Sequence, residues 1–211
     1  MDPSTSLASP SPDALGLAGL DGFYRWHARI YDWTRPLLLL GRTAAVRAVE
    51  AQAGQLVLDV GCGTGVSLPR LGRSGASVVG IECTQAMSRR AQVRIEHHEL
   101  EGKVLLDARP YGTHADYEGK ADRLLFSYSL SMIPPFSTVL ERARRDLRGR
   151  GRIVVVDFLD AKGLMARGLE RSHVQLGPAR LHVLQRLFPD HRLKVAPLGL
   201  WRYFLFVGEV A

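Results

Sequence analysis

The stretch LVLDVGCGTG, residues 56–65, decides the fold of this chain. Its apolar residues surround one carboxylate, Asp59, and three alternate glycines follow at Gly61, Gly63 and Gly65. An apolar strand that ends in a glycine loop before a helix is typical of an open α/β sheet, which binds ligands at the carboxyl ends of its strands. Glycine lets the backbone turn tightly and approach a ligand without a Cβ in the way. We therefore expect Asp59 and this loop to form part of a ligand site.

The rest of the chain continues the alternation of strands and helices. Apolar, strand-like runs are separated by helix-length segments, which indicates βαβ units and a mainly parallel sheet. The tail holds two further strand-like runs joined through Pro197 and Gly199, which predicts a hairpin with an antiparallel strand. The fold class is therefore α/β, with a Rossmann-like, seven-stranded, mainly parallel sheet, an antiparallel C-terminal strand and helices on both faces. The expected strands are 56–60, 77–82, 103–108, 121–129 and 152–158. A helix is expected after the glycine loop to about 73, and others at 84–100, 139–147 and around 163–187. A loop is expected at 148–151.

The N-terminal fifty residues divide into two parts. Residues 1–14 are rich in proline, serine and aspartate, which predicts a disordered tail. From about 15 to 50 the pattern is helical: Phe23, Trp26, Ile30 and Trp33 recur on one helix face. Pro36 is expected to start a second helix that runs toward Glu50. A single domain is then expected over 15–211.

Composition limits the possible partners and the location of the chain. The 211 residues carry a net charge of +7, which favours phospholipid headgroups, nucleic acid or acidic metabolites without choosing among them. The two cysteines, Cys62 and Cys83, make no disulfide framework, so we expect a cytoplasmic protein. We expect no signal peptide, and the longest aliphatic run, 37–40, is too short to span a bilayer.

The spacing of the glycines excludes two common phosphate-binding loops. A dinucleotide fingerprint reads G-x-G-x-x-G, whereas this chain has Val66 where the last glycine is needed. The Gly-Lys-Ser/Thr end of a P-loop is also missing. An acidic residue before the loop instead favours a cationic or hydroxyl-bearing ligand.

Residues 50–160 resemble the class I S-adenosylmethionine-dependent methyltransferases, whose first signature LVLDVGCGTG closely matches. The resemblance implies that the glycine loop borders the amino-acid part of S-adenosylmethionine. It also implies that Glu82, 21 residues after Gly61, binds both ribose hydroxyls, as a carboxylate can. Asp107 and Ala108 resemble the pair that contacts adenine, and 127–131 resembles the segment that faces the methyl group and the acceptor. The implied cofactor-binding residues are Asp59, Gly61, Cys62, Gly63, Thr64, Gly65, Glu82, Cys83, Met87, Asp107, Ala108, Ser127, Tyr24 and Tyr31, with no metal.

A narrower resemblance comes from YRWHARIYDWTR (24–35), SYSLSMIPPF (127–136) and the strand that ends in VVVDF. These stretches are similar to bacterial diacylglyceryl-homoserine and phosphatidylethanolamine N-methyltransferases. The resemblance implies a lipid amine acceptor, and lid helices (15–50) whose Tyr24 and Tyr31 close over the cofactor. The core would be 51–160 and the acceptor side 161–211. Residues 173–180 are longer than the compact His-Val-x-Pro-Arg of that group, so a soluble amine or another small acceptor stays open.

An amine has to be neutral to attack a methyl donor, so a base or desolvation is needed. His173 and Tyr128 are the candidate bases, and Tyr31 completes the candidate catalytic set. Repeated N-methylation produces a cation, which aromatic faces bind. Tyr24, Tyr31, Trp33, Tyr128 and Phe158 are candidates for such a cage, and aromatic residues at helical spacing equally often pack in a core. His97 and His98 are interpreted as surface residues.

The basic residues and the segment after the fourth strand bear on two other kinds of partner, a membrane and a nucleic acid. A cluster of arginines near 142–152 is either a patch for an anionic membrane or a solvated helix face. Methyltransferases of nucleic-acid bases usually carry an Asp/Asn/Ser-Pro-Pro-aromatic segment. Here Pro134-Pro135-Phe136 follow Met132-Ile133, so no nucleic-acid partner is expected. A non-catalytic cofactor-binding protein and an NAD-dependent oxidoreductase are weaker alternatives. The expected partners are a small-molecule or lipid amine and the inner membrane surface. The cluster comprises Arg142, Arg144, Arg145, Arg148, Arg150 and Arg152.

Overall fold

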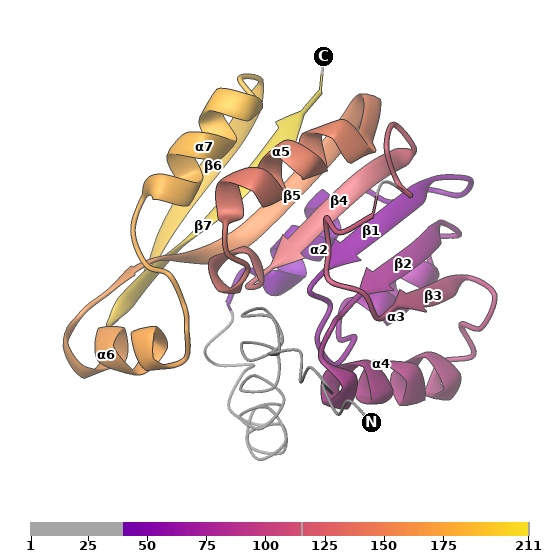
Figure 1. Cartoon of the computed structure of the whole chain (residues 1–211), viewed down its shortest axis with the longest axis horizontal. Helices are drawn as coiled ribbons and strands as arrows, with labels where there is room; N and C mark the ends of the chain where they lie inside the picture. Colours follow the sequence, from indigo (N-terminus) through magenta and orange to yellow (C-terminus); the bar gives the residue numbers. More distant parts are fainter. Residues whose placement is uncertain (1–39, 115, 211) are drawn as a thin grey trace, which may run out of the picture.

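The computed structural model describes residues 40–114 and 116–210, which form one mixed sheet with helices on both sides (Figure 1). The expected tail, the aromatic face at 23–33 and Pro36 lie outside these residues. The strands are β1 (Leu56–Val60), β2 (Ser77–Ile81), β3 (Val104–Asp107), β4 (Ala121–Ser127), β5 (Leu147–Ala161), β6 (His191–Leu198) and β7 (Trp201–Glu209). The helices are α2 (Arg42–Ala48), α3 (Leu68–Gly72), α4 (Gln85–His97), α5 (Phe136–Asp146), α6 (Gly163–Arg171) and α7 (Ala179–Leu187), with a short 3₁₀ helix η1 (Leu130–Met132).

The order of the strands places the glycine loop at the centre of the sheet. The order is β3-β2-β1-β4-β5-β7-β6. Strands β1 to β5 are parallel, and β7 is antiparallel to both β5 and β6. The chain proceeds outward from β1 in one direction and from β4 in the other, which creates a crevice at their carboxyl ends. The expected Rossmann-like architecture is confirmed.

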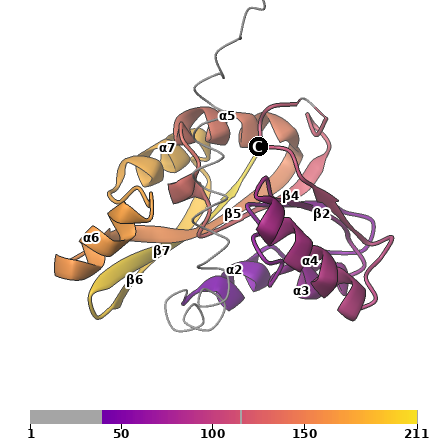
Figure 2. The same cartoon turned by 60° about the horizontal axis from the view of Figure 1, so that its bottom comes forward.

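The two faces of the sheet follow from strand alternation, because successive side chains point to opposite sides. In β1, Val57 packs in the cluster under α2, α3 and α4, whereas Leu58 packs in the cluster under α5 and α7. Figures 1 and 2 show these helices in two layers. Helix α6 stands apart from both layers, beyond the carboxyl end of β5.

Two of the expected boundaries are wrong in the first three quarters of the chain. Residues 148–151 were expected to be a loop, but they belong to β5, where the register against β4 shifts. Arg150 adopts a positive φ of 61°, and its N–H donates to the carbonyl of Val210 at 3.1 Å. This local irregularity accommodates the glycines without ending the strand. Helix α2 begins only at Arg42, because Gly41 precedes it with a φ of 88°.

The C-terminal third also departs from expectation at two places. The expected helical stretch around 163–187 is interrupted at 172–178, where His173 has a positive φ of 61° and Gly177-Pro178 follow. The hairpin turn consists of Gly199 and Leu200, whereas Pro197 lies within β6. Strand β6 is at the edge of the sheet, where a residue that lacks an N–H is tolerated.

Candidate active site

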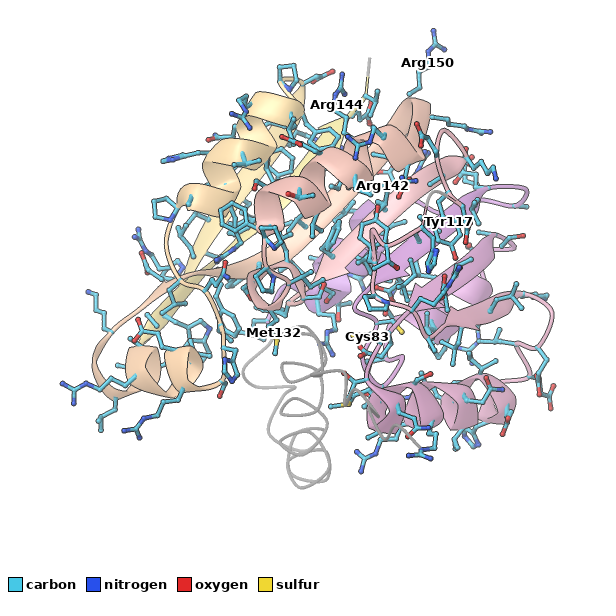
Figure 3. The ribbon with its side chains drawn as sticks, viewed as in Figure 1. Cys83, Tyr117, Met132, Arg142, Arg144 and Arg150 are labelled. Atoms are coloured by element: carbon cyan, nitrogen blue, oxygen red, sulfur yellow. The ribbon has the colours of Figure 1, made fainter. Side chains whose placement is uncertain are left out.

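A cavity of about 720 Å³ opens at the carboxyl ends of β1, β2 and β4. Its walls come from the glycine loop, the start of α4, the segment 110–113, η1 and one side of α5. Figure 3 shows Cys83, which follows β2, and Met132 of η1 at this end of the sheet, with Arg150 at the opposite end. The cavity therefore lies where the crevice of the strand order was expected.

The glycine loop is held tightly against its neighbours. The N–H groups of Gly61 and Cys62 both donate to the carbonyl of Ile81, at 2.8 and 3.1 Å. Gly61 has a φ of 68°, and a Cβ there would meet the Cβ of Ser129 at 2.4 Å. At Gly65, a Cβ would lie 3.1 Å from Cα of Ala91 in α4. Only glycine fits these two positions, and at Gly61, which lines the cavity, the backbone itself faces the space for a ligand.

Asp59 is the buried carboxylate of the site. It is fully buried; Oδ2 accepts a hydrogen bond from the hydroxyl of Ser67, and Oδ1 has no partner among the described residues. Burial raises the pKa of Asp59 to about 6. A buried acceptor without a partner is costly unless a ligand supplies a donor. Since Asp59 lines the cavity, an ammonium or hydroxyl group of a ligand fits this oxygen.

Glu82 is a second carboxylate of the cavity, and its orientation is fixed by the backbone. Oε2 accepts from the N–H of Gly63 at 3.0 Å, and Oε1 accepts from the N–H of Thr84 at 2.8 Å. Each carboxylate oxygen has a further lone pair. Both oxygens can therefore still accept hydrogen bonds from two neighbouring hydroxyl groups of a ligand.

The structure gathers most of the candidate residues around this cavity. Gly65 and Ala108 do not line it, and Tyr24 and Tyr31 lie outside the described residues. The candidates that do line the cavity are Asp59, Gly61, Cys62, Gly63, Thr64, Glu82, Cys83, Met87, Ser127, Tyr128 and His173.

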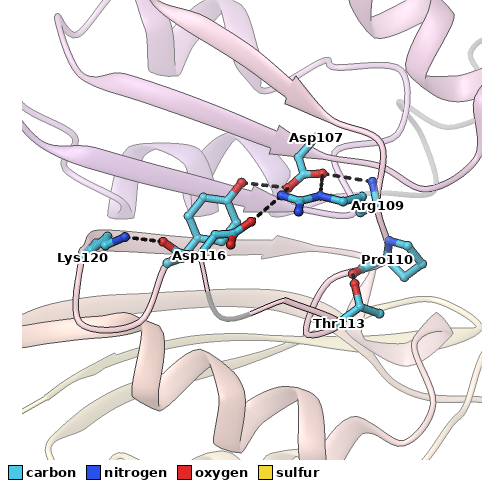
Figure 4. Close-up of polar contacts among 7 residues, drawn as sticks. Asp107, Arg109, Pro110, Thr113, Asp116 and Lys120 are labelled. Carbon is cyan, nitrogen blue, oxygen red and sulfur yellow. Dashed lines mark hydrogen bonds and ion pairs between the residues drawn. The ribbon is translucent and has the colours of Figure 1, made fainter.

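The carboxylate of Asp107, expected to contact adenine, is bonded to neighbouring protein groups (Figure 4). Its carboxylate accepts from the backbone N–H of Arg109 at 3.0 Å and from the guanidinium at 2.8 Å, and Tyr117 donates at 2.8 Å. These bonds, above all those from Arg109, lower the pKa of Asp107 to about 2. Arg109 also pairs with Asp116 at 2.7 Å. Asp107 lines a small neighbouring pocket, and the following segment 110–113 reaches the main cavity.

The two candidate bases differ in their surroundings. The hydroxyl of Tyr128 donates to the carbonyl of Leu40, and its ring packs edge-on against Phe158 at 4.8 Å between centroids. Burial raises the pKa of Tyr128, which disfavours the phenolate that a base requires. His173 is exposed at the cavity wall, in the turn between α6 and α7. Of these two side chains, the imidazole is the better proton acceptor.

A buried polar network that sequence reasoning missed holds the His173 turn in place. Arg180 is buried and donates to the carbonyls of Gln175 and, at 2.7 Å, Phe158. Asp157 is also buried and accepts from the N–H groups of Ser131 at 2.7 Å and Phe158 at 2.8 Å. Burial raises the pKa of Asp157 and lowers that of Arg180.

Backbone bonds complete this anchoring of the turn. Gln175 N–H donates to the carbonyl of Ser131 at 2.9 Å, and Gly177 N–H donates to that of Leu159 at 2.8 Å. The strand ending VVVDF and the stretch 173–180 were visible in the sequence, but nothing there indicated that they meet.

The arginine cluster of the sequence does not form one solvated surface. Arg142 is buried and lines the cavity, where its Nε donates to Asp146 Oδ1 at 2.7 Å. Arg148 pairs with Asp122, and the half-buried Arg152 pairs with Glu50 at 2.6 Å and Glu209 at 2.7 Å. Arg144, Arg145 and Arg150 are exposed. Arg142 and Arg152 therefore do not belong to a solvated face, whereas a membrane patch at the other four stays a prediction.

Arg42 and Tyr111 are two further cavity residues that the sequence did not single out. Arg42 Nε donates to Ser127 Oγ at 3.3 Å, and the hydroxyl of Tyr111 donates to Asp146 Oδ2 at 2.7 Å. Among the described residues, no group of three His, Cys, Asp or Glu side chains is placed to hold a metal ion. In the same part of the chain, no helix has the length and hydrophobicity needed to cross a membrane.

Comparison with known proteins agrees with this geometry. A family model described as a methyltransferase domain matches residues 51–182. Phosphatidylethanolamine N-methyltransferase of Cereibacter sphaeroides is 33% identical over 78% of this chain and 84% of that protein. Demethylmenaquinone methyltransferase of Clavibacter sepedonicus is 32% identical over 61% of this chain, which spans about half (53%) of that protein.

The fold also resembles that of solved structures. One is the 1,6-didemethyltoxoflavin-N1-methyltransferase of Burkholderia thailandensis, determined with 1,6-didemethyltoxoflavin and S-adenosylhomocysteine. The TM-score is 0.71 at 16% identity, over 99% of this chain and 94% of that chain.

Proposed function

Because this chain belongs to the methyltransferase-domain family and is an S-adenosylmethionine-dependent methyltransferase, we propose that it methylates an amine, on a lipid headgroup or a similarly small acceptor. The observation that carries the proposal is the likeness to a phosphatidylethanolamine N-methyltransferase. That likeness covers 78% of the chain, more than the shared domain at 51–182, so it includes segments outside the common core.

The residues of the cavity fit S-adenosylmethionine, which supplies an electrophilic methyl group on a sulfonium when bound. Asp59 offers a buried oxygen without a partner among the described residues, suited to an ammonium group. Glu82 offers an oriented carboxylate for the two ribose hydroxyls. The loop at Gly61 leaves no room for a side chain, so its backbone can border the amino-acid part.

The remaining residues prepare the acceptor. His173 accepts the proton that an ammonium acceptor has to lose before it can attack. Apolar side chains of the wall, Met132 and Ile133 among them, exclude water and favour the neutral amine over its charged form. Tyr128 forms part of the wall beside Phe158 rather than acting as a base. Tyr24 and Tyr31 are proposed to cover the cofactor, and the enzyme to work in the cytoplasm.

A second candidate function is methylation of a carbon atom in a quinone. It is favoured by the 32% identity to a demethylmenaquinone methyltransferase, although about half of that protein is matched. A soluble acceptor of specialised metabolism is the third possibility, and the toxoflavin-type N-methyltransferase shares the fold.

Mass spectrometry of lipid extracts distinguishes these acceptors. Cells that express the protein are compared with cells that express Asp59→Asn. Aminolipids that gain one, two or three methyl masses only with the wild-type protein support the proposal. A methylated quinone instead supports the second candidate. Unchanged lipids, with cofactor binding intact by calorimetry, overturn the lipid acceptor and leave a soluble one.

A further inference from the structure

Helix α6 and the β6–β7 turn form one protruding surface, which we call the α6–hairpin surface. It comprises Lys162, Leu164, Arg167, Arg171 and Leu200. The two segments are joined because the N–H of Lys162 donates to the carbonyl of Leu200 at 2.9 Å. Figures 1 and 2 both show α6 beside the ends of β6 and β7, beyond the main body of the sheet.

Two large apolar side chains project from this surface. Leu164 is 82% exposed and Leu200 is 59% exposed. No residue of the described helix α6 is buried, although Leu169 packs partly against the core. Two leucines left in water on adjoining segments gain nothing from folding, and exposed apolar patches commonly mark interaction sites.

The charges around these leucines favour an anionic partner. Lys162, Arg167 and Arg171 are exposed, and Glu170 is the acid on the same helix. The nearby Asp160 is neutralised by Arg202, whose Nε lies 3.0 Å from both carboxylate oxygens. Leucines flanked by cations are the pattern of a segment that lies in the headgroup region of a bilayer.

The surface also leads directly to the cavity. Helix α6 ends at Arg171, and His173, two residues later, lines the cavity wall. The basic residues near Arg150 lie instead at the opposite end of the sheet (Figure 3). A membrane on that side would face away from the cavity.

We propose that the α6–hairpin surface docks the enzyme on an anionic lipid bilayer, with Leu164 and Leu200 inserted among the headgroups and the three cations against lipid phosphates. This inference rests on the proposed function, because a lipid acceptor has to be reached from a membrane surface. Docking itself requires no turnover, so it can be tested separately.

The test measures co-sedimentation of the full chain with vesicles of phosphatidylcholine, alone or mixed with phosphatidylglycerol. The wild-type protein should bind the anionic vesicles, and binding should fall as salt rises. Leu164→Ser/Leu200→Ser should lower the partition coefficient by about tenfold or more, since two inserted side chains are lost. Lys162→Gln/Arg167→Gln should lower it by roughly fivefold for each charge removed.

Matched variants control for general effects of these substitutions. Val93 and Leu105 are each 64% exposed elsewhere, so Val93→Ser/Leu105→Ser should bind vesicles like the wild type. Arg144→Gln/Arg150→Gln removes two exposed charges outside the surface and should have no more than a small effect. Thermal melting and affinity for S-adenosylhomocysteine confirm that each variant is folded.

The possible outcomes test the docking surface and the proposed acceptor separately. The docking inference is overturned if the wild-type protein does not bind anionic vesicles, or if the serine pair binds them as well as the wild type does. A protein partner then remains as the use of this surface. If the serine pair loses vesicle binding, but the wild type does not methylate aminolipids in detergent micelles, the docking surface is supported and the proposed acceptor is not. Loss of methylation on vesicles but not in micelles for the serine pair supports both.

Discussion

The hydroxyl of Ser67 donates a hydrogen bond to Oδ2 of Asp59, while Oδ1 of the same buried carboxylate has no partner in the described part of the chain. The free protein therefore bears the cost of a half-satisfied charge at the floor of its cavity. Ligand binding can recover that cost. The same unpaired oxygen therefore lowers the stability of the free protein and favours binding of the cofactor.

Asp59→Asn should weaken binding of S-adenosylhomocysteine by about 1–3 kcal/mol, because a charge-assisted hydrogen bond to the ligand ammonium is lost. The free variant should be at least as resistant to thermal unfolding at pH 7 as the wild type, since no buried charge remains. Calorimetry and thermal melting measure the two effects. Asp116→Asn, outside the cavity, is the control, and equal affinities in both variants would remove Asp59 from the site.

The affinity for S-adenosylhomocysteine should depend on pH through Asp59. Its pKa is raised by burial from 3.8 to about 6, and the ionised form binds an ammonium group. Affinity should fall by about tenfold for each pH unit below 6, and Asp59→Asn should abolish this dependence. The stability of the free protein should change in the opposite sense. The contribution of this carboxyl is fully present below its unfolded pKa, near 4, and is lost as pH rises through about 6. Titration calorimetry from pH 5 to 8 provides the check.

Glu82→Gln should weaken the same ligand by about 1–3 kcal/mol. The amide has one acceptor oxygen, so its NH₂ group must face the N–H of Gly63 or Thr84, and the side chain must turn away. Glu99→Gln, at an exposed position, should leave the affinity unchanged. If the two variants bind alike, Glu82 does not hold the ribose.

Arg180→Gln should lower the free energy of unfolding by about 1–3 kcal/mol, because the carbonyls of Gln175 and Phe158 lose their buried donor and Asp157 loses a nearby cation. Arg186→Gln is a matched control, since Arg186 is exposed on the same helix. Denaturant titration measures both. A loss no larger than that of the control would show that the network does not stabilise the turn.

His173→Gln should reduce the turnover number by about a hundredfold or more near neutral pH, with cofactor affinity unchanged. The deficit should shrink at alkaline pH, where the acceptor amine loses its proton without help. Initial rates across pH measure this, and His182→Gln, on the exposed side of α7, serves for comparison. A deficit that is constant across pH would argue against a base at His173.

The central part of the site could be predicted because its signals are local. Asp59 and the three glycines lie within seven residues, and Glu82 follows at the end of the next strand. Strand order then brings them together at the carboxyl ends of β1 and β2. The apolar runs likewise predicted the parallel sheet, because the central strands β1, β4 and β5 are buried on both faces.

The remainder depends on contacts between distant residues. Arg180 can be buried because its guanidinium donates to the carbonyls of Gln175 and of Phe158, 22 residues away. Arg142 looked like a surface residue until Asp146 and the cavity wall were placed around it. Strand β5 continues through a glycine-rich stretch whose flanking residues, Leu147 and Arg152, both pair with β4, while Arg150 and Gly151 bond to the distant Val210. No pattern within a single segment records such partners.

The anchoring of the turn at 172–178 separates the roles of backbone and side chain. Gln175 and Gly177 are held through their main-chain atoms, and Arg180 also binds main-chain carbonyls. The side chains of His173 and Gln175 take no part in those bonds. The backbone thus fixes the turn by itself, so the side chain at position 173 can be exchanged in a folded enzyme and the contribution of its imidazole to catalysis measured separately from the architecture of the turn.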